Sequence, residues 1–167
     1  MPTFDTPEPI SATIDLAVGY IRLTGSDRGD TVVEVRPSDG SREVDVRAAE
    51  QTRVEYASGR LLVRAPKQRG LGVFGRAGSI DVAIELPAGS HVQGDAWVAA
   101  FHGVGRLGEC RVKTSSGDIQ LDHTGPLDLV TGAGAVLVER VVGDAQVSTG
   151  SSLRSARVQI WFTSKLL

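Results

Sequence analysis

Cysteine and aromatic side chains are scarce in this sequence of 167 residues. Cys110 is the single cysteine, so no internal disulfide can form, and we expect a small buried apolar residue here and not a reactive thiol. Aromatic residues make up 5% of the chain and hydrophobic residues 41%, so the core must consist mainly of aliphatic side chains. This apolar content, with a net charge of −2, excludes an intrinsically disordered chain.

The sequence also lacks an excess of charge of one sign and any long hydrophobic run. Its 18 Lys and Arg residues balance 20 Asp and Glu residues, which argues against nucleic acid or an anionic membrane as a partner. No apolar run approaches the roughly 18 residues of a membrane span. Residues 1–9 contain three prolines and lack the basic and apolar segments of a secretory signal. We therefore expect a flexible lead-in over residues 1–9 and a cytoplasmic protein without a membrane span.

Sustained helical periodicity is missing as well, whereas alternation of apolar and polar residues, which is typical of strands, is frequent. The segment 57–60 has the composition of a hairpin turn, and residues 48–51 form at most one helical turn. The sequence predicts an all-β protein whose β-rich N-terminal half, residues 10–90, consists of antiparallel strands. The strands expected are residues 10–16, 18–23, 31–36, 43–47, 53–56, 61–64 and 80–86.

Glycine is plentiful, with 20 residues, and part of it follows a repeat in the second half of the chain. Thr114, Thr131 and Thr149 are separated by 17 and then 18 residues, and the apolar positions around them shift in step. A unit of this length fits two short strands joined by corners of Gly, Ser and Thr. Such a unit buries its apolar face only by stacking on its neighbours. Residues 91–152 are therefore predicted to form the rungs of a short β-solenoid of the right-handed type.

Three segments resemble the DUF4097-type putative adhesin family of bacteria, which is common in actinobacteria. They are residues 80–89, residues 105–119 and the run Thr131-Gly-Ala-Gly134, and the resemblance covers about residues 10–150. It implies a β-solenoid and brings no catalytic or ligand-binding residue with it. Family members usually continue for several more rungs and are secreted, whereas here the glycine punctuation ends after Ser152. We expect residues 153–167 to be an atypical C-terminal tail, either a cap or an altered ending of a truncated solenoid.

Two motifs suggest chemistry but have a simpler explanation. Residues 70–75 match the G-x-G-x-x-G pattern of dinucleotide sites, but no helix can begin before the next strand, so a loop is expected. Asp122 and Glu139 lie 17 residues apart, so stacked rungs would bring them about 5 Å apart, near the carboxylate separation of retaining glycosidases. Neighbouring carboxylates beside His123 and Arg140 are also typical of a solvated surface, which we favour.

The remaining candidates point to structure more than to function. His91, His102 and His123 lack the spacing of a metal site, and Ser115 and Ser116 lie at a corner and not in a nucleophile motif.

A basic stretch offers only weak support for a nucleic-acid groove, because a single aromatic, Phe74, interrupts it. Its members are Arg60, Arg64, Lys67, Arg69 and Arg76. Trp97 and Phe101 are either core residues or an exposed binding patch, and core is the preferred interpretation.

These observations predict a non-catalytic interaction or scaffold protein with no catalytic, cofactor-binding or metal-binding residues. The expected partner is a protein or a second copy of the chain, bound at the open end of the solenoid. One alternative is a cytoplasmic structural β-solenoid that assembles with itself. A less favoured alternative is a carbohydrate-active enzyme that uses Asp122 and Glu139.

Overall fold

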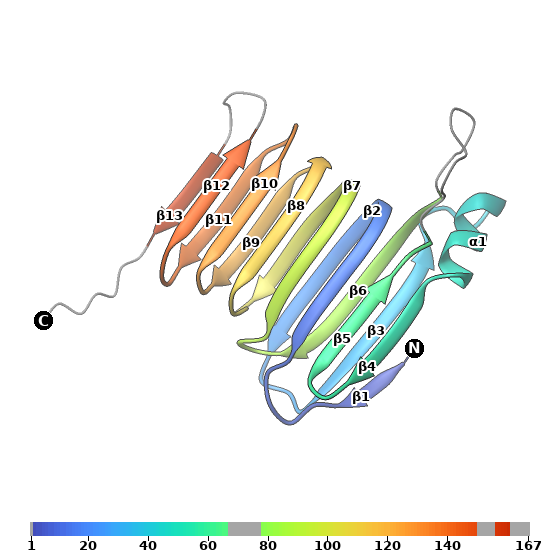
Figure 1. Cartoon of the computed structure of the whole chain (residues 1–167), viewed down its shortest axis with the longest axis horizontal. Helices are drawn as coiled ribbons and strands as arrows, with labels where there is room; N and C mark the ends of the chain where they lie inside the picture. The colour runs from blue at the N-terminus through green and yellow to red at the C-terminus, as the bar shows by residue number, and fades with distance from the viewer. Residues whose placement is uncertain (1, 67–77, 150–155, 161–167) are drawn as a thin grey trace, which may run out of the picture.

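The computed structural model describes residues 2–66 and 78–149, together with the backbone of residues 156–160. The described part is mostly strand, with one short helix, and its strands form an open mixed sheet stacked side by side along the long axis of the molecule (Figure 1). The elements are β1 (Thr3–Asp5), β2 (Ser11–Ser26), β3 (Asp30–Pro37), α1 (Glu43–Glu50), β4 (Arg53–Ala57), β5 (Arg60–Arg64), β6 (Ser79–Pro87), β7 (His91–Gly105), β8 (Cys110–Ser116), β9 (Ile119–Thr124), β10 (Leu127–Thr131), β11 (Val136–Val141), β12 (Ala145–Thr149) and β13 (Ala156–Ile160).

Two long strands, β2 and β7, organise the sheet. In β2 the buried positions are even-numbered up to Leu16 and odd-numbered from Ile21 onward, and β7 changes in the same way between Ala96 and Ala99. A strand that changes its buried face midway presents its two halves differently to the core. The two strands that we expected at residues 10–16 and 18–23 are therefore the two halves of one continuous strand.

The second half of the sheet consists of parallel strands that stack on the two halves of β7. The first half of β7 is followed by β8, β10 and β12, and its second half by β9, β11 and β13. Thr131 is the register partner of both Thr114 and Thr149, so the three threonines that align in the sequence lie side by side. Each strand thus pairs with the strand 17 or 18 residues away.

The first half combines both pairing directions. Strands β1, β3 and β6 pair antiparallel, and β4 and β5 form the predicted hairpin, whose turn has positive φ at Ser58 and Gly59. Strand β2, however, pairs in parallel with β5, β6 and β7. The prediction that residues 10–90 contain antiparallel strands alone is therefore wrong, because alternation reveals which face of a strand is buried and not the direction of its neighbours.

Two local differences from the sequence-based expectations lie near the same edge. The segment 43–47, expected as a strand, begins helix α1, where Glu43 forms an ion pair of 2.9 Å with Arg47 one turn later. Its two valines also fit the half-buried side of a helix, so the alternation was ambiguous over so short a range. Residues 3–5, inside the expected lead-in of residues 1–9, form β1 on β3, where the Thr6 and Thr31 hydroxyls lie 2.8 Å apart.

One continuous core of aliphatic side chains connects both halves of the sheet. It runs from Ile10 to Val141 and contains Phe101 as its one fully buried aromatic ring among the described residues. The corners next to this core are tight. At Gly117, where φ is +142°, an added Cβ would lie 1.9 Å from the Ala99 carbonyl oxygen, so glycine is required there. The Thr131 hydroxyl donates to the Gly117 carbonyl at 3.0 Å and fixes the same corner.

Candidate functional site

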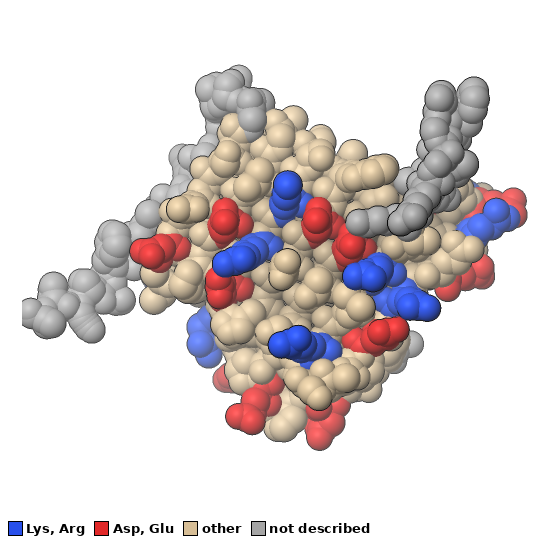
Figure 2. Space-filling view, in the orientation of Figure 1, with Lys and Arg blue, Asp and Glu red and all other residues tan. Residues whose placement is uncertain are grey.

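The strands β5, β2, β7, β8 and β10 present a broad polar surface, which we call the outer face. Its charged residues form a row across four strands, because Asp15 is in register with Arg64 and Asp95, and Asp95 is in register with Lys113. A second row, one strand position away, consists of Thr13, Gln93, Arg111 and Asp128. Acidic and basic side chains are interspersed over the face of the molecule shown in Figure 2. Neither sign of charge dominates these two rows.

A shallow groove of about 530 Å³ opens at one end of the outer face, and we call it the Asp15 groove. The Arg64 Nε and Asp15 Oδ2 atoms inside it are 3.9 Å apart. This volume lies within the roughly 300–1,000 Å³ that is typical of small-molecule sites. A small depression of about 60 Å³, which reaches Ala17, shares Gln51, Ala65 and Pro66 with the groove. The groove is lined by Asp15, Gln51, Arg53, Arg64, Ala65 and Pro66.

A second hollow of about 250 Å³ lies at the start of β2, β7 and β8. His91 lines it, and its Nδ1 atom accepts a hydrogen bond of 2.9 Å from the Glu109 backbone N–H. The imidazole therefore joins two neighbouring strands. Gln93 and Arg111 line the same hollow and continue it into the second row of the outer face.

Trp97 and Phe101 have opposite environments, although the sequence favoured a core position for both. Phe101 is 1% exposed, which confirms that prediction, whereas Trp97 is 62% exposed, so the prediction for Trp97 is wrong. The cause is the change of buried face in β7, which leaves Trp97 and Val98 outside in succession. A period of two carried through the whole strand cannot foresee this change.

Asp122 and Glu139 lie on the neighbouring strands β9 and β11, between the register pairs Leu121–Val138 and His123–Arg140. Asp122 is half-buried, and its Oδ2 atom accepts a hydrogen bond of 3.1 Å from the Gly105 backbone N–H. This contact gives Asp122 a structural role at the end of β7. Glu139 is exposed.

The three histidines do not come together. His91 joins β7 to β8 as described, and His102 Nδ1 lies 3.1 Å from the Tyr20 hydroxyl on β2. His123 contributes its backbone carbonyl, which accepts from Leu107 N–H at 2.9 Å. Across residues 2–66 and 78–149, no group of three or more histidine, cysteine or acidic side chains is placed to hold a metal ion.

The corner residues Ser115 and Ser116 lie beside a threonine that is bound to the backbone. Thr114 is buried, and its hydroxyl donates to the Ser116 carbonyl at 3.0 Å and approaches the Ala99 carbonyl at 3.4 Å. Thr131 repeats this arrangement one strand further along. These hydroxyls satisfy carbonyl groups at the corner.

Cys110 is fully buried in the core, as expected. Burial raises the pKa of its thiol to about 12, and the negative charge of Glu109 contributes to the same shift. Because the thiolate is the reactive form, this environment makes Cys110 inert near neutral pH.

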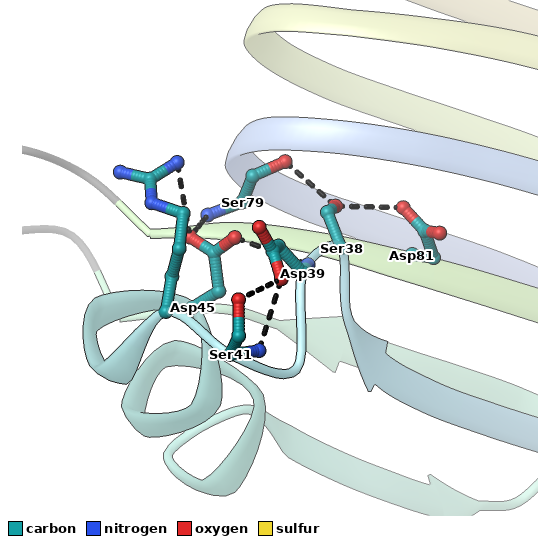
Figure 3. Close-up of polar contacts among 7 residues, drawn as sticks. Ser38, Asp39, Ser41, Asp45, Ser79 and Asp81 are labelled. Carbon is teal, nitrogen blue, oxygen red and sulfur yellow. Dashed lines mark hydrogen bonds and ion pairs between the residues drawn. The ribbon is translucent and has the colours of Figure 1, made fainter.

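A polar cluster that the sequence reasoning missed joins α1 to β3 and β6 (Figure 3). The buried Asp45 carboxylate accepts hydrogen bonds from the backbone N–H groups of Ser79 at 2.9 Å and Asp39 at 3.2 Å. Hydrogen bonds from Ser41 lower the pKa of Asp39. On the exposed side, the Ser38 hydroxyl lies 2.7 Å from both the Ser79 hydroxyl and the Asp81 carboxylate. The Ser-Asp-Gly run after β3 was the one signal in the sequence, and it indicated only a turn.

Some of the predicted features lie outside the described residues. These are the glycine motif of residues 70–75, together with Lys67, Arg69, Phe74 and Arg76, and most of the tail 153–167. Of the basic stretch, Arg60 and Arg64 are described, and both are exposed on β5. None of the helices in the described part is long and apolar enough to span a membrane.

Comparisons with known proteins indicate the fold. No family model matches the chain, and no curated protein matches it. A putative cell adhesion protein from Clostridium sporogenes ATCC 15579 has a similar structure, with a TM-score of 0.58, 11% identity, and coverage of 97% of this chain and 98% of that one. A putative adhesin from Bacteroides fragilis NCTC 9343 matches with a TM-score of 0.34, 13% identity and 96% coverage of both chains. The first comparison shows that this chain shares the fold of the clostridial protein over nearly its whole length.

Proposed function

We propose that this chain is a non-catalytic interaction protein of the adhesin type, built as a short β-solenoid of the right-handed type. Support comes from the parallel stacking of strands 17 or 18 residues apart and from the similarity to a solved structure whose name describes cell adhesion. The sequence resemblance to DUF4097-type proteins agrees with this proposal. The cytoplasmic location expected from the sequence is also part of it, and cell fractionation tests that location.

The observation that carries the proposal is the open edge formed by β12 and β13. Within the described residues, β12 pairs only with β10, and β13 pairs only with β11. An edge strand presents unpaired N–H and C=O groups that another chain can extend. The opposite side of the sheet ends differently, in the three-residue β1 and in β4, which carries exposed Arg53 and Glu55. Short and charged edge strands are a common protection against pairing.

This difference assigns the interaction to the C-terminal edge. The partner is another protein or a second copy of the chain, which adds its own strands to β12 and β13. A second copy adding in the same direction would continue the stack, so open-ended assembly into filaments is the structural alternative to a defined complex.

Sedimentation velocity over a wide range of concentrations tests the self-association. We expect the wild-type sedimentation coefficient to rise with concentration, and a double Gln146→Lys, Ser148→Lys variant to remain monomeric because charge on an edge strand opposes pairing. Gln120→Lys, an exposed position on the interior strand β9, is the matched control and should behave like the wild type. Electron microscopy of the concentrated protein then distinguishes filaments from closed oligomers. A wild-type protein that stays monomeric throughout, or edge variants that associate like the wild type, would contradict self-association at this edge.

A further inference from the structure

Trp97 is exposed without a structural reason in the described part of the chain. Its side chain is 62% exposed, the largest exposed fraction among the large hydrophobic residues described. Tryptophan is on average highly buried, because leaving an indole in water forgoes a large gain in hydrophobic free energy. An exposed tryptophan therefore deserves a functional explanation.

The neighbours of Trp97 leave its side chain accessible. On β2 the residue beside it is Ala17, which lies between the register pairs Leu16–Ala96 and Val18–Val98. On β8 it is Ser115, between the partners of Ala96 and Val98. Both side chains are small, so the indole stands above them on either side.

The surface beside Trp97 is polar and leads into the Asp15 groove. Asp95 precedes Trp97 by two residues, so both side chains lie on the outer face. Ala17 connects Trp97 to the depression that shares Gln51, Ala65 and Pro66 with the groove. One continuous surface thus combines an aromatic side chain with carboxylate, guanidinium and amide groups.

The charge of this surface favours an uncharged ligand. The row next to Trp97 contains Arg64 and Lys113 as cations and Asp15 and Asp95 as anions, so its charges cancel. A single-stranded nucleic acid also stacks on aromatic rings, but its sites follow the phosphates with a positively charged groove. A protein surface usually needs a larger apolar centre than one indole.

We propose that the outer face binds a neutral oligosaccharide. A pyranose ring has one face rich in C–H groups, which packs against the indole of Trp97, and hydroxyl groups that both donate and accept hydrogen bonds. The Asp15 carboxylate accepts from these hydroxyls, and Arg53, Arg64 and Gln51 donate to them in the groove. Successive strands about 4.8 Å apart repeat such groups along the face, which suits a chain of several sugar units. This inference uses a different surface from the C-terminal edge and is independent of self-association.

Titration calorimetry with cellohexaose, maltohexaose and chitohexaose, three neutral hexasaccharides, tests the proposal. We expect at least one of them to bind, with Trp97→Ala weakening its affinity at least ten-fold and Trp97→Phe by no more than about three-fold. Tyr20→Ala is the matched control, because Tyr20 is the other partly exposed aromatic residue described and lies on the half of β2 beyond the change of buried face. Its affinity should equal that of the wild type. Thermal melting confirms that each variant is folded.

A fluorescence measurement locates the contact. In a Trp161→Phe background, Trp97 is the only tryptophan of the chain, so a shift of its emission on sugar binding reports contact at this residue. Failure of all three sugars to bind, or wild-type affinity in Trp97→Ala, would overturn the proposal. Preferential binding of heparin or of a single-stranded oligothymidine would overturn it as well, because the site would then be selective for anions.

Discussion

In the first part of the molecule, through β6, strands lie beside neighbours from distant parts of the sequence and in both directions. From β7 onward they lie in parallel beside strands only 17 or 18 residues away. The first part also contains the helix and the buried carboxylate of Asp45, whereas the second part repeats one corner built from threonine and glycine. Both parts share one core. The same aliphatic core is thus held by specific polar contacts in one part and by repetition in the other.

The largest expected effect comes from truncating the core in each part. Leu23 on β2 and Leu129 on β10 are both fully buried. We expect Leu23→Ala and Leu129→Ala each to lower the free energy of unfolding by about 3 kcal/mol, measured by urea denaturation. Hydrogen exchange should then separate them. Leu129→Ala should increase exchange mainly in β8 to β13, because stacked units contact only their neighbours. Equal deprotection of β3 and β6 would show that the two parts open together.

The corner of the second part is tested by Gly117→Ala. The new Cβ would lie 1.9 Å from the Ala99 carbonyl oxygen, and φ is +142°. We expect a loss of about 2–3 kcal/mol in unfolding free energy. Gly40→Ala is the control, since a Cβ there meets nothing within 4 Å, and its effect should be small. A Gly117→Ala variant as stable as the control would remove the steric explanation of this corner.

The polar cluster of the first part is tested by Asp45→Ala. Removing the buried carboxylate leaves the N–H groups of Ser79 and Asp39 without their acceptor, so we expect a loss of about 2 kcal/mol. Asp81→Ala removes one exposed hydrogen bond to Ser38 and should cost less than about 1 kcal/mol. Thermal denaturation of both variants measures the difference. If the two cost the same, burial is not what makes Asp45 important.

A smaller effect distinguishes two threonines in the second part. Thr131 donates to the Gly117 and Ala133 carbonyls, and Thr131→Val should cost about 1 kcal/mol. Thr124 is buried too, but its hydroxyl has no partner among the described residues. Thr124→Val should therefore be neutral or stabilising in the same denaturation experiment. A destabilising Thr124→Val would reveal a partner for that hydroxyl.

The smallest effect concerns pH. The pKa of the Cys110 thiol is about 12 in the folded chain and about 8.5 when unfolded, so only the unfolded state loses this proton between these values. Stability is unaffected below about pH 8 and then falls, by about 0.8 kcal/mol at pH 9. Subtracting the profile of Cys110→Ala isolates this contribution. Identical profiles for the two proteins would contradict the burial of the thiol.

The sequence predicted the second part better than the first, for a physical reason. A repeat fixes which strands are neighbours and in which direction, so Thr114, Thr131 and Thr149 could be aligned without coordinates. Alternation alone fixes only the buried face, and it left the parallel pairing of β2 undetermined. It also mistook the start of α1 for a strand. Trp97 was misplaced because the buried face changes within β7. The Asp45 cluster depends on contacts with β6, 34 residues later, that no local pattern announces.

The position of β2 has a consequence for how the chain folds. It is the second strand to leave the ribosome, yet its partners β5, β6 and β7 end at residues 64, 87 and 105. Until more than half of the chain has been made, β2 has none of its neighbours on either side. Pairings across such long separations close slowly, because the loop entropy must be lost first. Once β7 is in place, each later strand can add directly to the one before it. Synthesis therefore divides into a long wait for β7 and a rapid sequential growth after it.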